Sequence, residues 1–198
     1  MYKVLAKVMA NRLRAVIGSV VSDSQSAFVK GKQILDGILF ANEVVDEARR
    51  LNKEILLFKI DFKKGYDSMD LDYLDAVMVK MNFPTLWRKW IYECVVSAMA
   101  SMLVNRCSTE EFPMERGLRH GDPLSPFLFL LAVEGFHILM KSVVEKGLYQ
   151  GYQVGHIEVV RLSHFQFVDD TLIFGEKSWA NVRSMREVLF FFLKNYLA

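Results

Sequence analysis

The feature of the sequence with the clearest chemical potential is a pair of adjacent carboxylates, Asp169 and Asp170, between two apolar runs. The runs cover residues 164–168 and 172–174, and a short polar segment centred on the two aspartates between two such runs predicts a β-hairpin. Neighbouring carboxylates in apolar surroundings repel each other, so the pair needs a compensating contact. Two interpretations are open at this point. The pair is either a solvated turn, where Asp is common, or a site for a hard divalent cation, which prefers carboxylate oxygens.

A third carboxylate, Asp61, ends the short apolar run of residues 54–61, which we interpret as a buried strand. If that strand neighbours the hairpin, Asp61 converges on Asp169 and Asp170. Three such carboxylates can hold two Mg²⁺ ions about 3.5–4 Å apart, the arrangement used by polymerases and nucleases. Asp67 and Asp70 lie nearby, but a helix entry and a helix cap are the better interpretations of those two residues.

Hydrophobic periodicity predicts the elements that must position these carboxylates. Apolar residues at helical spacing predict helices over residues 3–20, 35–50, 71–81, 86–95, 126–145 and 182–196. Two further strands are expected over residues 101–104 and 111–114, with polar loops over residues 22–32 and 117–126. Asp70 and Thr85 are predicted helix caps. The helix after Thr85 is expected to turn Leu86, Trp90 and Cys94 inward.

Composition places the chain among ordinary globular proteins. It has 198 residues, 52% of them hydrophobic and 24% charged, with a net charge of +2. This balance excludes a disordered tail, a coiled-coil rod and a purely electrostatic nucleic-acid binder, although a local basic groove remains compatible with it. No apolar run is long enough for a membrane span, so we expect no membrane association. Cys94 and Cys107 provide neither a disulfide framework nor zinc-site spacing, and an intracellular location is expected.

Three motifs in a fixed order carry a resemblance to a known family. They are FKID with GYD at residues 58–61 and 65–67, GLRHGDPLSP at residues 117–126, and FVDD at residues 167–170. Together they resemble the reverse transcriptases of non-LTR (LINE-type) retrotransposons, with plant members closest. An upstream block containing QSAFV at residues 25–29 resembles the finger region of that family. The resemblance covers nearly the whole chain.

This resemblance implies RNA-templated DNA synthesis on a DNA primer from deoxynucleoside triphosphates, with two Mg²⁺ ions or with Mn²⁺ in their place. It implies that the catalytic and metal-binding residues are Asp61, Asp169 and Asp170. It implies that the nucleotide-binding residues are Phe62, Tyr66, His120, Gly121 and Lys32. The implied template- and primer-binding residues are Gly117, Arg119, Pro123 and Ser125. The Tyr66 ring would exclude a ribose 2′-hydroxyl. The lysines Lys59, Lys63 and Lys64 are either phosphate contacts or solvated side chains.

Several positions depart from the family pattern. His120 stands where Gln is usual, and Lys32 stands where Arg is usual, which keeps the charge but loses the planar fork. Gly65 replaces a usual Ala and is expected to loosen a helical turn by roughly 0.5–1 kcal/mol. Asn105 and Arg106 replace the usual Asn-Gly of a hairpin turn, where Arg resists the positive φ that the turn requires.

The predicted fold class is α+β: a polymerase palm, which is an antiparallel sheet with helices on one face, plus partial fingers. Residues 1–53 are expected to form the fingers. Residues 54–198 are expected to form a palm that stops after the catalytic hairpin and its following helix, without the thumb and endonuclease segments of a parent polyprotein. If the chain acts like the family, its place is the nucleus.

Two alternatives to an active reverse transcriptase stay open. One is an inactive retroelement remnant, retained at most as a nucleic-acid-binding palm without catalysis. The other is an RNA-templated RNA polymerase, against which Tyr66 and the finger block argue.

Overall fold

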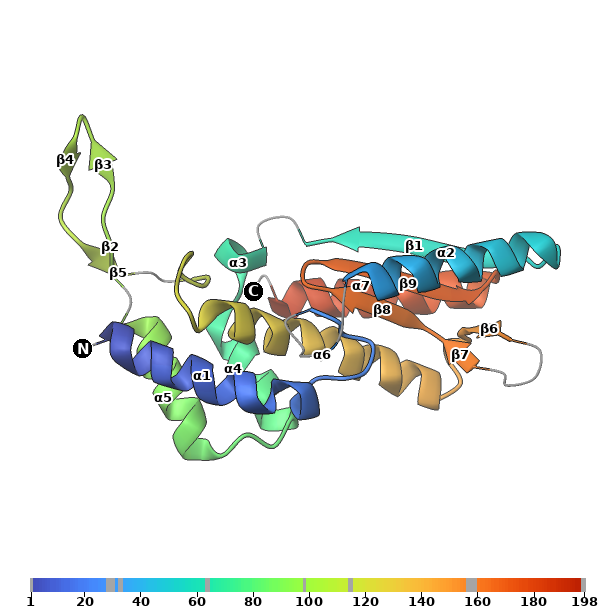
Figure 1. Cartoon of the computed structure of the whole chain (residues 1–198), viewed down its shortest axis with the longest axis horizontal. Helices are drawn as coiled ribbons and strands as arrows, with labels where there is room; N and C mark the ends of the chain where they lie inside the picture. The colour runs from blue at the N-terminus through green and yellow to red at the C-terminus, as the bar shows by residue number, and fades with distance from the viewer. Residues whose placement is uncertain are drawn as a thin grey trace.

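A three-stranded antiparallel sheet lies at the centre of the fold (Figure 1). The computed structural model describes residues 2–27, 31, 34–62, 65–97, 99–113, 116–155 and 160–196. The strand order is β1 (Ile55–Asp61), β9 (Asp170–Glu176) and β8 (His164–Phe167). Asp170 is paired with Asp61 on one side and with Phe167 on the other. The predicted hairpin is therefore confirmed.

The hairpin turn lies one residue earlier than the sequence suggested. Its two turn residues are Val168 and Asp169, and Asp170 is already the first residue of β9. The β1–β9 ladder is the cause, because it continues without interruption to the pair of Asp61 and Asp170. Val168 accordingly adopts a φ of 51°, a conformation that its branched side chain disfavours.

The central helix is α6 (Ser125–Glu145), which packs on one face of the sheet beside α7 (Trp179–Tyr196). Three more helices pack around this pair: α1 (Tyr2–Val20), α4 (Leu71–Lys80) and α5 (Thr85–Val96). By length and apolar content alone α6 would pass as a membrane span. Its side chains are mostly buried among the other helices and the sheet, so it is the core helix that the sequence predicted.

Helix α2 (Ile34–Arg50) lies on the opposite face of the sheet. Val44 and Ala48 of α2 are buried against Phe174 of β9 and against Tyr152 in a small ladder of β6 (Tyr152–Val154) and β7 (Val160–Leu162). The α+β palm with helices packed on its sheet is thus confirmed, and α2 adds a helix on the second face.

A long hairpin projects from the body between α5 and α6 (Figure 1). It consists of two short ladders: β2 (Met99–Ala100) with β5 (Phe112–Pro113), and β3 (Leu103–Val104) with β4 (Cys107–Ser108). A hairpin was predicted here, but its return strand already begins at Cys107. Asn105 and Arg106 form the turn with φ values of 51° and 69°. Arg106 therefore occupies the conformation that the sequence comparison marked as unfavourable.

Two sequence-based predictions about burial are wrong. Strand β1 is not buried, since Leu57 and Phe58 are more than two-fifths exposed. It is an edge strand with β9 as its one neighbour. In α5, Leu86 and Trp90 are exposed, while Ile91, Cys94 and Val95 face the core.

Of the two predicted helix caps, one is wrong and one is confirmed. Thr85 is the first residue of α5 rather than its cap, and the preceding Pro84 offers no side-chain hydrogen bond. The predicted cap of α4 is confirmed, because the Asp70 carboxylate accepts a hydrogen bond of 2.8 Å from the Tyr73 amide.

Candidate active site

The three predicted carboxylates lie at one edge of the central sheet. Asp61 is the last residue of β1 and Asp170 the first residue of β9, and the two are direct cross-strand partners. Asp169 occupies the adjoining turn, where its carbonyl accepts a hydrogen bond of 3.1 Å from the Phe62 amide. This bond extends the ladder beyond Asp61 and fixes the turn against β1. Residues far apart in the chain thus meet because a strand end and a hairpin turn share one edge.

A lysine ammonium partly neutralises these carboxylates. Lys59 Nζ lies 2.9 Å from Asp170 Oδ1, and both side chains are about half exposed. The hydrogen bond to Asp170 and the charges of Asp170, Asp61 and Asp169 together raise the pKa of Lys59. Of the three carboxylates, Asp170 is the one in direct contact with Lys59. The sequence left open a phosphate contact or a solvated role for Lys59, and the structure gives it this ion pair; Lys63 and Lys64 lie outside the described residues.

The donor set has the chemistry of a magnesium site. Carboxylate oxygens are the ligands that Mg²⁺ takes in phosphoryl-transfer sites. A cation, the Lys59 ammonium, already forms an ion pair with one of them, Asp170. In the ranges that the structure describes, no three His, Cys, Asp or Glu side chains are gathered closely enough to form a ready-made ion site. Mutual repulsion and the pull of Lys59 on Asp170 both act against such gathering. The residues fit the ion, and the side chains would have to turn toward it.

Tyr66 lies next to the carboxylates on the short helix α3 (Gly65–Ser68). Its ring stacks on the ring of Phe129 with a centroid distance of 4.6 Å and an interplanar angle of 5°. Burial raises the pKa of Tyr66, and the charge of Asp169 raises it further. The phenol therefore stays protonated and its ring is held flat against α6, beside Asp169.

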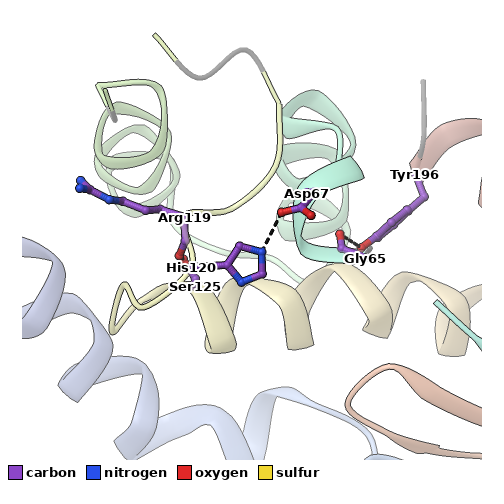
Figure 2. A network of polar contacts seen from close by, with 6 residues as sticks. All are labelled: Gly65, Asp67, Arg119, His120, Ser125 and Tyr196. Carbon is purple, nitrogen blue, oxygen red and sulfur yellow. Dashed lines mark hydrogen bonds and ion pairs between the residues drawn. The ribbon is translucent and has the colours of Figure 1, made fainter. Parts of the chain in front are cut away.

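Gly65 permits this stacking. A Cβ at Gly65 would lie 2.7 Å from the Phe129 ring, and the Gly65 carbonyl accepts a hydrogen bond of 2.6 Å from the Tyr196 hydroxyl (Figure 2). Aromatic side chains therefore pack closely around Gly65, the glycine that departs from the family pattern. This packing offsets the loss of helix stability that we expected from a glycine at this position.

His120 connects Tyr66 to the loop that precedes α6. Its Nε2 lies 2.7 Å from Asp67 Oδ1 (Figure 2). Its ring stacks on the ring of Tyr66 with a centroid distance of 5.5 Å. These contacts explain how a histidine is accommodated where the family usually has Gln. The imidazole is anchored on one side by a carboxylate and on the other by an aromatic face, so its position relative to Tyr66 is defined.

The loop of residues 117–124 is held by backbone contacts. The Gly117 amide donates to the Met69 carbonyl at 3.0 Å, and the Leu118 amide donates to the Tyr66 carbonyl at 2.7 Å. Ser125 is buried, and its hydroxyl donates to the Arg119 carbonyl at 2.8 Å. Gly117 and Ser125 therefore shape the loop from inside.

The remaining predicted loop residues are more accessible. Arg119, His120 and Gly121 are exposed and Pro123 is half-buried, so this side of the loop faces solvent. Figure 2 shows the Arg119 side chain pointing away from Asp67 while His120 points toward it.

The structure does not place the side chains of two other predicted nucleotide-binding residues, Phe62 and Lys32, at this site. Phe62 is buried, and its ring lies 5.3 Å from the ring of Phe192 in the aromatic core. Its backbone, rather than its ring, faces the edge that carries the aspartates. Lys32 lies outside the described residues.

A buried polar cluster behind the β8–β9 hairpin was not found from the sequence. The Gln166 amide of β8 donates to the Ser24 carbonyl at 2.8 Å, and the Ser26 amide donates to the Gln166 carbonyl at 3.1 Å. His164 Nε2 lies 3.0 Å from His137 Nδ1, and the Ser24 hydroxyl contacts both rings. The segment around Ser24 thus extends the sheet beyond β8.

The signal for this cluster was present but not interpreted. Glu134 and His137 interrupt the apolar run of α6, and both serve the cluster. Glu134 Oε1 accepts a hydrogen bond of 2.9 Å from the Ser22 amide, and its other oxygen accepts from the Ser22 hydroxyl. Polar residues on the apolar face of a core helix need partners.

Comparison with known proteins agrees with this arrangement. The profile of the family described as "Reverse transcriptase (RNA-dependent DNA polymerase)" matches residues 1–197. The Transposon TX1 uncharacterized 149 kDa protein of Xenopus laevis is 29% identical over 141 residues, which is 71% of this chain and 11% of that protein. The Retrovirus-related Pol polyprotein from type-1 retrotransposable element R2 of Nasonia vitripennis is 24% identical over 171 residues, which is 86% of this chain and 16% of that protein.

A solved structure supports the fold alone. Telomerase from Candida albicans, solved with a fragment of telomeric RNA, superposes with a TM-score of 0.64 at 11% identity, and the match covers 98% of this chain and 33% of that one. The chain spans less than a fifth of either curated relative.

Proposed function

The chain belongs to the reverse transcriptase (RNA-dependent DNA polymerase) family, in its LINE-type branch, and we propose that it carries the polymerising site of an RNA-directed DNA polymerase. The observation that supports this best is the meeting of Asp61 with Asp169 and Asp170 at one sheet edge. These are the three carboxylates that the family motifs identify. They come from distant parts of the sequence and lie beside Tyr66, at the exposed end of the sheet.

In this proposal Asp61 and Asp169 hold two divalent ions, Mg²⁺ or Mn²⁺, and Asp170 supports them. When bound, such ions activate the primer 3′-hydroxyl and stabilise charge on the reacting phosphoryl group. The chain's own part is to keep Asp61 and Asp170 in register and to hold the Asp169 turn through the Phe62 amide. Lys59 forms an ion pair with Asp170, and a bound ion would compete with it for this carboxylate.

The residues around Tyr66 are proposed to bind the incoming deoxynucleotide. Tyr66 is fixed by Phe129 and His120, so its ring can exclude a ribose 2′-hydroxyl by shape. His120 and Gly121 lie on the exposed side of the loop, within reach of a nucleotide placed on Tyr66. Lys32 keeps its proposed role as a phosphate contact.

Template and primer are proposed to lie against the same loop. Arg119 and Pro123 are its accessible members, while Gly117 and Ser125 act by shaping its backbone. Residues 1–53 are assigned to the fingers and residues 54–198 to the palm. RNA template, DNA primer and deoxynucleoside triphosphates are the proposed partners, together with segments of a parent polyprotein.

Primer extension tests this function. The full chain is incubated with an RNA template, an annealed DNA primer, deoxynucleotides and Mg²⁺. We expect extension by the wild type and none by Asp169→Asn. Asp46→Asn, which changes an exposed carboxylate on α2, is the matched control and should extend normally. Absence of extension by a folded wild-type chain would overturn the self-sufficient enzyme and favour a nucleic-acid-binding palm without catalysis.

A further inference from the structure

A hollow of about 550 Å³ lies between the start of α1 and the loop that precedes α6. Its lining comes from two segments more than a hundred residues apart in the sequence. The lining residues are Lys3, Lys7, Arg119, His120, Gly121, Asp122 and Pro123. The volume is in the range of ordinary ligand sites, and His120 among these residues stacks on Tyr66.

The charge of this hollow is strongly one-sided. It holds Lys3, Lys7 and Arg119 together with the imidazole of His120, against the single carboxylate of Asp122. The Asp122 side chain is buried, and its Oδ1 accepts a hydrogen bond of 2.8 Å from the Leu124 amide within its own loop. In the described part of the chain, none of the three cations has a carboxylate within ion-pair distance. The whole chain has a net charge of only +2, so this local excess is not a general property of the surface.

The two lysines are placed to act together. Lys3 and Lys7 are one helical turn apart, so they lie on the same side of α1 with Cβ atoms about 5–6 Å apart. Ala6, Met9 and Ala10 are buried in the core, and by helical spacing the two lysines flank this buried stripe. Exposed lysines on a helix are usually solvated, but here a guanidinium from a distant loop converges on the same hollow. A pair of lysines on one side and a single guanidinium on the other suit an extended polyanion.

The hollow continues the candidate active site. His120 belongs to both, since it lines the hollow and stacks on Tyr66, which lies beside Asp169. Arg119 points to the far side of the loop from Asp67 (Figure 2). A strand that lies on Tyr66 and passes His120 would therefore reach the three cations as it leaves the site.

We propose that this hollow binds backbone phosphates of single-stranded RNA, the unpaired template strand on its way to the aspartates. That this strand is the template rests on the proposed function. The triphosphate of a nucleotide is the other source of phosphate, and the lining disfavours it: a reacting triphosphate must lie at Asp61 and Asp169, whereas the hollow contains one carboxylate that is already hydrogen-bonded.

The test is the salt dependence of RNA binding, which does not require catalysis. A fluorescent single-stranded RNA of about 12 nucleotides, within the usual site size, is titrated with the full chain between about 50 and 200 mM NaCl. In Lys3→Gln/Lys7→Gln, the slope of log affinity against log salt should shrink by about 1.4, because each lost single-strand phosphate contact removes ~0.7. Affinity at about 0.1 M NaCl should fall about 10- to 30-fold.

The matched control is Lys141→Gln/Lys146→Gln, which removes the same charge at the far end of α6, about 30 Å along that helix. It should keep the wild-type slope. Equal slopes for the two double variants would overturn the proposal. Competition by a deoxynucleoside triphosphate that is lost in Lys3→Gln/Lys7→Gln would also overturn it, because the hollow would then be a triphosphate site.

Asp169→Asn separates this inference from the proposed function. That variant should retain the full RNA slope even though extension is lost. If the wild type fails to extend primers but Lys3 and Lys7 still set the slope, the phosphate site stands and the proposed enzyme does not.

Discussion

Asp61 and Asp170 are direct cross-strand partners at the open end of the β1–β9 ladder. Like charges directly opposite each other destabilise an antiparallel pair. The sheet therefore carries a local electrostatic conflict at the point where the family motifs place catalysis. Lys59 relieves part of it by its contact with Asp170, and Asp169 in the adjoining turn adds to it. The arrangement costs the fold stability, and the proposed cation site would offset that cost.

Removal of one partner should stabilise the fold while it abolishes the proposed activity. Asp61→Asn relieves the repulsion and is expected to raise the free energy of unfolding by about 0.2–1 kcal/mol in metal-free buffer. Urea unfolding measures this, with Asp46→Asn as the control, because its exposed contact with Arg49 is worth at most a few tenths of a kcal/mol. A lower stability of Asp61→Asn than of wild type would show that the two carboxylates do not repel each other in the fold.

The Lys59 ammonium should compete with divalent cations for the carboxylates. Lys59→Gln removes the ammonium that pairs with Asp170, so we expect a small loss of stability without metal. Mg²⁺ should then stabilise the variant more than the wild type, since a ligand that binds the folded state raises stability with its affinity. Thermal unfolding with and without Mg²⁺ measures both effects. Lys141→Gln, from a comparable exposed pair with Glu145, is the control; identical Mg²⁺ shifts in Lys59→Gln and wild type would refute the competition.

The buried histidine pair predicts sensitivity to acid. Burial, aided by nearby His137, lowers the pKa of His164 to about 3 from an ordinary value of 6.5. Burial, aided by the charge of Lys141, also lowers the pKa of His137. The unfolded chain therefore binds more protons than the folded chain between pH 6.5 and about 3, and stability falls as the pH falls through that window.

From about pH 7 to about pH 5, His164 alone should reduce the free energy of unfolding by about 2 kcal/mol. Urea unfolding at both pH values measures it, and His164→Gln should lose correspondingly less between them. An unchanged pH dependence in that variant would show that His164 is not the responsible group.

The turn of the projecting hairpin offers a stabilising substitution. Asn105 and Arg106 both have positive φ, which a type I′ turn requires and which Arg disfavours. Arg106→Gly should stabilise the β3–β4 ladder by about 0.5–1 kcal/mol. This is the free energy of the relieved backbone strain minus the cost of the greater conformational entropy of glycine in the unfolded chain. Amide hydrogen exchange across residues 103–108 reports this local equilibrium. Arg106→Lys keeps the Cβ and should show no slower exchange; slower exchange in both variants would point to a cause other than φ.

Local sequence signals were enough for most elements of this fold. The stripe of Met185, Phe192 and Tyr196 predicted α7, and all three are buried. Asp70 predicted the start of α4 and caps it. The convergence of Asp61 with the hairpin also followed from the sequence, because two strand ends with carboxylates needed only to be neighbours.

The predictions that failed depend on partners distant in the sequence. The burial of β1 could not be read from its apolar run, because exposure is set by its position at the sheet edge. The turn moved to Val168 because the ladder with β1 outweighs the local preference of valine. His137 and His164 meet only because α6 crosses β8 and the Ser24 segment adds to it. No spacing along the chain encodes such contacts.

Two glycines of the loop before α6 allow the cost of backbone strain to be measured apart from the cost of a steric clash. Gly117 and Gly121 have nearly the same φ, 80° and 77°. A Cβ at Gly117 would lie 2.6 Å from the Asp67 carbonyl oxygen and 2.7 Å from that of Tyr66, whereas a Cβ at Gly121 meets nothing within 4 Å. Both alanine variants incur left-handed strain of about 1–2 kcal/mol. Only Gly117→Ala also has to displace backbone, which should bring its loss to about 3–5 kcal/mol.

The displaced backbone belongs to the segment that carries Tyr66, because the Leu118 amide bonds the Tyr66 carbonyl at 2.7 Å. Gly117→Ala should therefore also disturb the stacking of Tyr66 on Phe129, while Gly121→Ala should leave it intact. Urea unfolding gives the stability difference between the two variants, and the near-ultraviolet circular dichroism of the tyrosine gives the local change. Equal losses of stability would mean that backbone strain alone sets the cost of both substitutions. The loop would then pack less tightly against the Tyr66 segment than its hydrogen bonds indicate.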